Sequence, residues 1–468
     1  MRSAKVLLVY PSVFYAFKWG VASPFKPHMF NLLSFLRGNG IGCESLDLEQ
    51  KIGRPANEEE IKHFREETVR LLSTRDFDIV AISCWSSLNY LSSVMVAEIC
   101  KQVNNKSVVV VGGYHPTAVA SDFVYQKSPF DFIVKGEGEE ALLAICRGKI
   151  KKDNERKIIQ GIPLDLAASG FSLSHGTLGF ITKNKSACIY LSRGCPFLCN
   201  FCMERAKRHG VWRSYSVDQA VTIIRRLSDD HDVERINITD ACFGYNKHWR
   251  REFLSKLIKS KIKREFWAET RIDLIDREDV DLLSKLNFRI DFGVESCSAT
   301  MLRIMGKTKN PKMYLKKCEE VTGYMNKKGA RYSLFFIFNH PGETCHTYIE
   351  TLRFIDSLII KHKTISGVVG VQDFAFFPGS HVHTHLNHYK KEYGTVVKHR
   401  QWWKEKGPHE ELARSVIASR SLMLKFGETK TYWREGMAAI VEKVIKKNKS
   451  LLSLVRSRDY SLGDFVYR

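Results

Sequence analysis

The stretch from Ser192 to Cys202 reads Ser-Arg-Gly-Cys-Pro-Phe-Leu-Cys-Asn-Phe-Cys. It follows directly after a short apolar run, Cys188–Leu191, that predicts a strand. Cys195, Cys199 and Cys202 stand in it at C-x3-C-x2-C spacing. Soft thiolates on a tight loop are typical ligands of zinc or of iron–sulfur clusters. The stretch therefore predicts a metal centre at the carboxyl end of a strand.

The spacing favours an iron–sulfur cluster over zinc. A structural zinc site takes four ligands, usually from two cysteine pairs, and the sequence holds no second C-x2-C pair. Three thiolates leave one iron of a [4Fe–4S] cluster without a protein ligand, so a small molecule can bind there. We expect Cys195, Cys199 and Cys202 to ligate such a cluster.

An aromatic residue, Phe201, precedes the third cysteine. The pattern C-x3-C-x-aromatic-C resembles the defining signature of the radical S-adenosylmethionine (SAM) enzymes, and the resemblance extends over about residues 187–377. It implies that SAM binds the open iron through its amine and carboxylate. One electron, from a donor such as flavodoxin or ferredoxin, then splits the sulfonium and yields a 5′-deoxyadenosyl radical. The cofactors carry this chemistry, and the protein orients them.

The same resemblance implies a set of SAM-binding residues. It places Phe201 beside SAM, Glu269 on its ammonium group and Glu295 on its ribose hydroxyls. Lys307 matches a basic position near the SAM carboxylate, and Asp240 matches a common acidic position at a strand end. The ordinary alternatives are strand-end carboxylates and a solvated lysine. No catalytic residue is assigned beyond the cofactor ligands.

Residues 1–150 alternate apolar strand patterns with amphipathic helices, which predicts a parallel sheet. Five such units form a flavodoxin-like, Rossmann-type doubly wound domain whose ligand lies at the carboxyl ends of the strands. A helix over 58–72 is expected, with Asn57 as its cap. The strands are expected at 6–10, 43–48, 77–83, 108–111 and 130–134.

A flavodoxin-like domain before a radical SAM core resembles the cobalamin-binding class. The resemblance implies cobalamin, as methylcobalamin, at the strand ends. The expected contacts are Ser12, Ser83, Trp85, Ser86, Gly112, Gly113, Gly136 and Glu137. The D-x-H-x-x-G sequence that ligates cobalt in many such domains is absent from residues 1–150. Either cobalamin binds without a protein histidine on cobalt, or the domain has lost the cofactor. In the first case we expect Trp85 to pack against the lower face of cobalamin.

The rest of the chain divides into three parts. Residues 151–184 lack periodicity and are expected to form a linker. Six strand–helix units over 185–380 predict a partial (β/α)6 radical SAM barrel. Residues 381–468 form a basic, mainly helical C-terminal region, with helices expected over 410–426 and 438–452.

Four histidines crowd the start of that C-terminal region, at 381, 383, 385 and 388. Spacing of two would place them on one face of a strand, where they could bind a metal. A loop near the mouth of the barrel is the favoured interpretation, with some histidines contacting substrate or carrying protons.

Composition bounds the partners. The 468 residues include no apolar run long enough to span a membrane, and the N-terminal apolar run is too short for a secretory signal, so a cytoplasmic protein is expected. The net charge of +22 favours acidic partners. The basic residues are scattered rather than clustered, which is typical of a solvated surface and makes nucleic acid an unlikely ligand.

These features favour a cobalamin-dependent radical SAM methyltransferase that methylates an unactivated carbon or phosphorus of a small molecule. The positive net charge favours an acidic substrate. The alternative is radical rearrangement or ring formation without methyl transfer. A third hypothesis, a nucleic-acid- or partner-binding protein with a relic cluster, rests on the charge alone. A methylthiotransferase is disfavoured because no trio of N-terminal cysteines could hold a second cluster.

Overall fold

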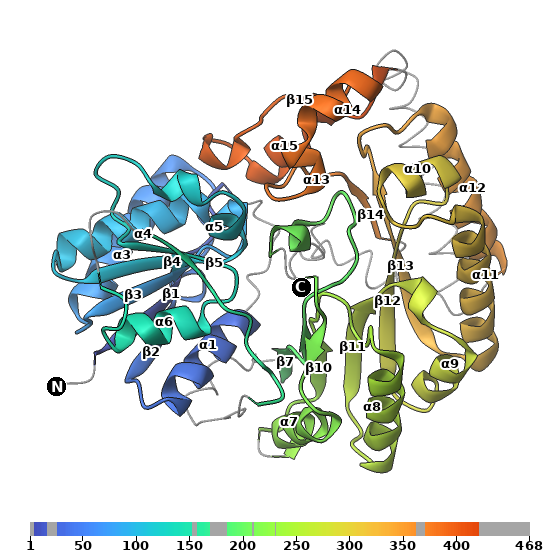
Figure 1. The fold of residues 1–468 in the computed structure, drawn as a ribbon, viewed down its shortest axis with the longest axis horizontal. Helices are drawn as coiled ribbons and strands as arrows, with labels where there is room; N and C mark the ends of the chain where they lie inside the picture. Colours follow the sequence, from blue (N-terminus) through green and yellow to red (C-terminus); the bar gives the residue numbers. More distant parts are fainter. Residues whose placement is uncertain are drawn as a thin grey trace.

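The computed structural model describes residues 4–15, 26–151, 157–168, 185–207, 210–229, 231–361 and 370–420. Two α/β domains lie side by side, and a C-terminal segment lies along one edge of both (Figure 1). Among the described helices, none combines the length and the apolar character needed to cross a membrane.

The N-terminal domain is built on one six-stranded, fully parallel sheet with the strand order β2-β1-β3-β4-β5-β6. This order is the flavodoxin-like arrangement with one strand added at the edge. The five predicted strands are confirmed. The sixth falls in the stretch expected to be a linker, because three residues are too few to leave a periodic pattern. The strands are β1 (Val6–Tyr10), β2 (Cys43–Asp47), β3 (Ile79–Ser83), β4 (Val108–Gly112), β5 (Phe132–Lys135) and β6 (Ile158–Gln160).

Helices cover both faces of this sheet. On one face α1 (Pro27–Gly38) packs beside α6 (Glu139–Cys146), and on the other α3 (Glu58–Ser73) packs beside α4 (Tyr90–Val103). Asn57 caps α3 as predicted, since its side chain accepts a hydrogen bond from the backbone N–H of Glu60. Two short helices, α2 (Leu48–Lys51) and α5 (Tyr114–Ala118), follow β2 and β4.

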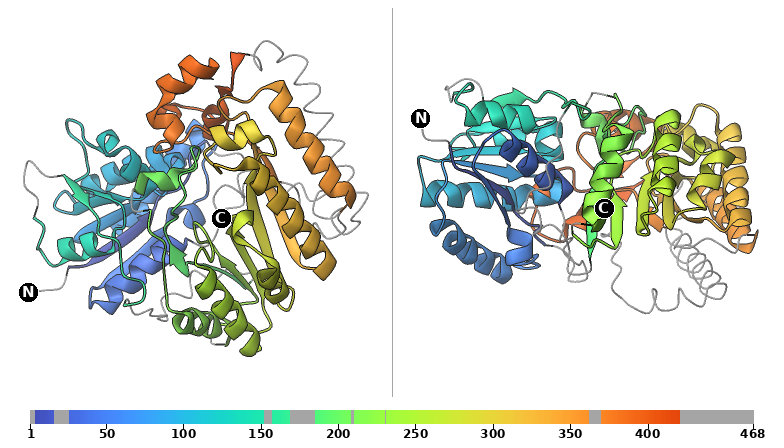
Figure 2. Two further views of the ribbon diagram at one scale, coloured as in Figure 1. Left: turned by 45° about the vertical axis from the view of Figure 1, so that its right-hand side comes forward. Right: turned by 90° about the horizontal axis from the view of Figure 1, so that it is seen from below.

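The second domain is a partial barrel of six parallel strands in chain order, as predicted. Its strands are β7 (Ser186–Ile189), β10 (Arg235–Ile238), β11 (Glu265–Thr270), β12 (Phe288–Glu295), β13 (Arg331–Phe338) and β14 (Gly370–Asp373). The helices outside it are α7 (Val217–Asp229), α8 (Lys247–Lys259), α9 (Arg277–Leu283), α10 (Ala299–Ile304), α11 (Pro311–Lys328) and α12 (Cys345–Lys361). Seen from below, these helices line the outer side of the sheet (Figure 2).

The strands of the barrel alternate between an apolar outer face and a polar inner face. On β11, Phe266 and Ala268 belong to the core under the helices, so Trp267 and Glu269 face inward. On β12, Asp291 faces inward and accepts a hydrogen bond of 2.6 Å from the Trp267 indole. The inner face therefore offers charged groups to a ligand.

The C-terminal segment is mainly helical, with α13 (His381–Thr384), α14 (Leu386–Tyr393) and α15 (His409–Arg414). The helix expected over 410–426 is wrong beyond Arg414, because β16 (Val416–Ile417) pairs antiparallel with β15 (Val396–Val397). Residues 421–426 and the helix expected over 438–452 lie outside the described residues.

The four clustered histidines lie on α13 and α14 or between them, so the strand face considered for them is wrong. The rings of His381 and His385 stack at 3.9 Å because a separation of four residues aligns them on a helical turn. Nowhere in the described ranges do three histidine, cysteine or acidic side chains converge on one ion.

The C-terminal segment contacts both domains and bridges them. The Trp403 indole donates to Asp122 of the N-terminal domain at 2.7 Å, and the Lys404 ammonium lies 2.7 Å from the other oxygen of that carboxylate. At the barrel, the Gly342 N–H donates to the Ala418 carbonyl at 2.9 Å. The relative placement of the domains is therefore fixed from this edge.

Candidate active site

A cavity of about 320 Å³ lies where the carboxyl ends of the N-terminal strands meet the mouth of the barrel. Six of the predicted cobalamin contacts line it: Ser83, Trp85, Gly112, Gly113, Gly136 and Glu137. Two of the predicted SAM contacts, Asp240 and Glu269, line it from the barrel. Residues predicted for two different cofactors thus share one cavity.

Ser12 and Ser86 are not among the lining residues. The Ser12 hydroxyl donates to the Gly53 carbonyl at 2.8 Å, and its own carbonyl accepts from Asn89 at 2.7 Å. The Ser86 side chain caps a turn by accepting from the Leu88 N–H. Both serines hold the loops behind the cavity wall in place.

Aromatic rings form part of the wall. Trp85 stacks on His28 with ring centroids 4.2 Å apart and planes tilted by 7°, and the edge of Tyr114 meets Trp85 at 4.9 Å. Burial, with a contribution from Lys26, lowers the pKa of His28 to about 3, so its imidazole is neutral. His28 was not predicted as a lining residue; its position in the first turn of α1, after the β1 loop, was the available signal.

Glycines let the loops after β3, β4 and β5 come together. Gly113 has φ +122°, and a Cβ atom there would overlap the Cys84 carbonyl. The Thr117 hydroxyl joins the loops by donating to the Gly113 carbonyl at 2.6 Å and accepting from the Gly136 N–H at 2.9 Å. This wall is therefore built largely from backbone, which a large ligand can approach closely.

The cysteine loop begins and ends in a small antiparallel ribbon, β8 (Ser192–Arg193) paired with β9 (Arg213–Ser214). Asp240 fixes its start by accepting from the Leu191 N–H at 2.8 Å and from the Ser192 hydroxyl at 2.5 Å. Burial raises the pKa of Asp240 to about 6. In this structure Asp240 positions the loop as well as lining the cavity.

Two of the three cysteines of the loop accept hydrogen bonds. The Glu204 N–H donates to the Cys202 sulfur at 3.4 Å, and the Arg271 guanidinium donates to the Cys199 sulfur at 3.6 Å. In the described part of the chain these thiols do not converge on a single ion. Three thiols on one loop fit an iron–sulfur cluster, in which each cysteine would bind a different iron.

The remaining predicted SAM residues gather beside this loop. The Lys307 ammonium and the Glu295 carboxylate form a buried pair at 3.0 Å. The Phe201 ring meets the buried ring of His340 edge-on at 6.4 Å. Glu269 on β11 lies beside Asp291 on the neighbouring strand β12, and burial, reinforced by the charges of Asp291 and Glu295, raises the pKa of Glu269 to about 8. A cation bound there would favour the ionised carboxylate.

Comparison with known families agrees with this geometry. Residues 28–146 match the B12 binding domain family, and residues 189–355 match the radical SAM superfamily. The chain is a cobalamin-dependent radical SAM enzyme. Its cofactors are a [4Fe–4S] cluster, SAM and cobalamin, and the three cysteines, the acidic barrel face and the glycine-lined wall suit these groups.

Similar proteins fall into more than one reaction class. The enzyme is 23% identical over 313 residues to an uncharacterized methyltransferase of Pyrococcus horikoshii, PH0819. This alignment covers 63% of the present chain and 67% of the relative. The enzyme is 29% identical over 195 residues to the anaerobic magnesium-protoporphyrin IX monomethyl ester cyclase of Synechocystis, which covers 38% of each chain. The match thus spans two-thirds of the first relative and little more than a third of the second.

Among solved structures, the enzyme resembles the radical SAM methyltransferase TsrM from Kitasatospora setae. The TM-score is 0.71 at 16% identity, and the superposition covers 94% of this chain and 89% of TsrM. At that identity the likeness shows a shared fold for both domains.

Two cationic residues of the enzyme's cavity were not predicted from the sequence. Arg193 and Lys207 line it, yet neither was assigned a role from the sequence. Arg193 pairs with Glu137 at 3.1 Å and with Glu139 at 2.7 Å, across the domain boundary. The signal was the neighbourhood of two motifs, since Arg193 precedes Gly194 of the cysteine loop and both acids belong to the Gly136–Glu139 turn.

Proposed function

We propose that the enzyme methylates an unactivated carbon, or phosphorus, of a small-molecule substrate. The observation that supports this most is the single cavity lined by the strand ends of the B12-binding domain and by Glu269 of the barrel. Methyl transfer to an unactivated atom needs a hydrogen-abstracting group and a methyl donor within reach of one substrate. A cavity at a domain interface meets that need.

When bound, SAM and the cluster would supply a carbon-centred radical, and methylcobalamin would supply the methyl group. The residues of the chain bind and orient. Glu269 would accept hydrogen bonds from the SAM ammonium, and the buried Glu295–Lys307 pair would face the ribose hydroxyls and the carboxylate of SAM. Charge-assisted bonds of this kind, made in a buried site, fix the orientation of a ligand.

The cavity wall formed by the B12-binding domain would hold the corrin. Trp85, stacked on His28, offers an aromatic surface, and the Gly112–Gly113 backbone allows close approach. Because burial keeps the pKa of His28 low, the imidazole adds no charge to this wall. A largely apolar, backbone-lined wall excludes water from a reactive centre.

The chain's net charge of +22 supports an acidic substrate. Within the cavity, Arg193 and Lys207 are accompanied by four acidic side chains: Glu137, Glu139, Asp240 and Glu269. Lys207 already pairs with Glu204 at 3.0 Å, so the lysine is oriented rather than extended into water. A one-electron donor of the flavodoxin or ferredoxin type completes the set of partners.

The test uses labelled SAM and no guessed substrate. Anaerobically reconstituted enzyme, with cobalamin and reductant, is supplied with SAM carrying a CD3 group, and cobalamin is analysed by mass spectrometry. We expect CD3-cobalamin to accumulate. Release of 5′-deoxyadenosine with no label on cobalamin would overturn methyl transfer while leaving the radical SAM assignment intact.

The second candidate is ring formation without methyl transfer, favoured by the 29% identity to the cyclase of Synechocystis. The same labelling separates the two, because a cyclase leaves no CD3 group on cobalamin or product. The mass of a cyclase product would include no added methyl group, whereas a methyltransferase product is heavier than its substrate by one CH2.

A further inference from the structure

Arg271 stands immediately after β11, between the strand that carries Glu269 and the short turn Ile272–Leu274. It is 6% exposed. One terminal nitrogen of its guanidinium donates to the Cys199 sulfur at 3.6 Å, and the other donates to the Lys307 carbonyl at 2.6 Å. Arg271 thus links the cysteine loop to the Lys307 loop, beside the Asn200 side chain, which donates to the Ile304 carbonyl at 2.7 Å.

The guanidinium also meets the loop through its flat face. Its central carbon lies 3.8 Å from the centre of the Phe197 ring, which stands between the first and second cysteines. On the solvent side, Asp273 binds it in a two-point fork at 3.0 and 2.9 Å. All three nitrogens of the guanidinium are therefore engaged, and one N–H group is held on the sulfur.

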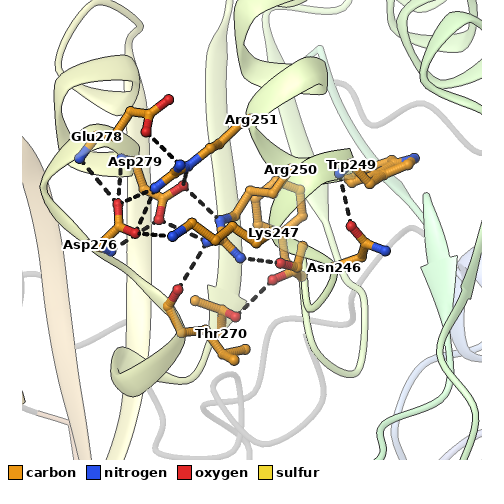
Figure 3. Close-up of polar contacts among 12 residues, drawn as sticks. Asn246, Lys247, Trp249, Arg250, Arg251, Thr270, Asp276, Glu278 and Asp279 are labelled. Atoms are coloured by element: carbon orange, nitrogen blue, oxygen red, sulfur yellow. Dashed lines mark hydrogen bonds and ion pairs between the residues drawn. The ribbon is translucent and has the colours of Figure 1, made fainter.

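The backbone that carries Arg271 is itself anchored. Behind it, Arg250 donates to the Leu274 carbonyl at 2.9 Å and pairs with buried Asp279 at 2.7 Å, and Thr270 donates to the Phe243 carbonyl at 2.7 Å. Figure 3 shows this network gathered around the end of β11. Because these groups are fixed by packing, the Arg271 donor needs no rearrangement when charge develops on the sulfur.

A cation and an N–H donor beside a ligating thiolate stabilise the more negative state of an iron–sulfur cluster, since hydrogen bonds to the sulfurs help to set its reduction potential. We propose that Arg271 is a positioning residue that raises the reduction potential of the cluster held by Cys195, Cys199 and Cys202. This inference rests on the proposed cluster site. Arginine suits the task better than lysine because its planar fork serves the sulfur, the carbonyl and the carboxylate together.

The experiment is a redox titration of the full-length, reconstituted enzyme, without SAM, in which dithionite supplies one electron per cluster and electron paramagnetic resonance counts the reduced form. Wild type is compared with Arg271→Gln and Arg271→Lys. The control is Arg277→Gln, which removes the same charge from α9, where the guanidinium contacts the Tyr324 ring instead of a cysteine. Iron and sulfide content, measured first, tests the cluster site separately.

At the wild-type midpoint, we expect the reduced-to-oxidised ratio to fall at least tenfold in Arg271→Gln, which is about 59 mV for a one-electron couple. Arg271→Lys, which keeps the charge, should fall between the two, and Arg277→Gln should match wild type. An unchanged ratio in both Arg271 variants, an equal shift in the control, or loss of the cluster from both variants would show a purely structural role and overturn the proposal. A wild-type enzyme without iron and sulfide would instead defeat the cluster site.

Discussion

The Glu137 carboxylate of the B12-binding domain lies 3.1 Å from the Arg193 guanidinium of the barrel. Arg213, at the other end of the cysteine loop, also binds Glu137. Since β8 and β9 pair with each other, one carboxylate holds both ends of the loop. The position of the cluster relative to the cobalamin wall therefore depends on this ion triad.

The ion triad of Glu137, Arg193 and Arg213 predicts that the stability of the fold decreases in acid. Although burial opposes it, the Arg213 and Arg193 contacts lower the pKa of Glu137 from 4.5 to about 2. A carboxyl whose pKa is lower in the folded state stabilises the fold above pH 4.5, and that stability, about 3 kcal/mol, is lost as the pH falls toward 2. Urea unfolding of wild type and Glu137→Gln should differ by this amount at pH 6 and converge in acid. Glu98→Gln, at an exposed pair, is the control; a difference that does not shrink in acid would contradict the assignment.

Glu269 predicts opposite effects on stability and on SAM binding. Its pKa is raised from 4.5 to about 8, so the folded apoprotein holds this proton more tightly and loses stability as the pH rises between those values. Glu269→Gln, a neutral isostere, should be up to about 4 kcal/mol more stable at pH 8 in thermal or urea unfolding. Isothermal calorimetry should show SAM binding weakened roughly 10- to 100-fold, the cost of a charge-assisted hydrogen bond. Unchanged SAM affinity would remove Glu269 from the site.

The buried pair of Arg250 and Asp279 predicts a large loss of stability. Both side chains are at most 1% exposed, so Asp279→Ala leaves an uncompensated buried cation (Figure 3). We expect a loss of about 3–5 kcal/mol in the free energy of unfolding. The control, Asp218→Ala, breaks an exposed pair with Lys256 and should cost less than about 1 kcal/mol. Equal costs for the two substitutions would contradict this account.

The close packing around Gly113 predicts that a larger residue there causes loss of cobalamin but not of the iron–sulfur cluster. A Cβ atom at this position overlaps the Cys84 carbonyl and is strained by the positive φ. Gly113→Ala should release cobalamin on gel filtration while iron and sulfide stay bound. Gly148→Ala, at a positive φ with open space around it, is the control and should keep both cofactors at a cost of about 1 kcal/mol. Retention of cobalamin by Gly113→Ala would show that this wall does not hold it.

Local patterns allowed much of the fold to be predicted. The strands of both sheets carry apolar runs with flanking turns, and the cysteine motif lies within eleven residues. Periodicity gave β11 and β12 and their order, because consecutive strand–helix units place parallel strands side by side. The strand β6 and the ribbon β8–β9 were missed, since two or three residues hold no period.

The contacts that organise the site could not be predicted from local patterns. Glu137 lies 76 positions from Arg213, and Arg271 lies 72 positions from Cys199. Only the packing of the two domains decides which of the many arginines meets which carboxylate. Ser12 and Ser86 show the converse, because a strand end in the right place can serve a loop instead of the cavity.

The central claim is that three thiolates hold a [4Fe–4S] cluster whose open iron takes SAM. Its most direct test compares wild type with Cys199→Ala after anaerobic reconstitution with iron, sulfide and cobalamin, measuring the reduced-cluster resonance and 5′-deoxyadenosine under reductant. In wild type, the reduced-cluster resonance should be present, should change when SAM is added, and should be accompanied by release of 5′-deoxyadenosine. In Cys199→Ala, the resonance, its response to SAM and the nucleoside release should all be lost, while cobalamin still binds. Nucleoside release by Cys199→Ala, or zinc in place of the cluster in wild type, would contradict the account.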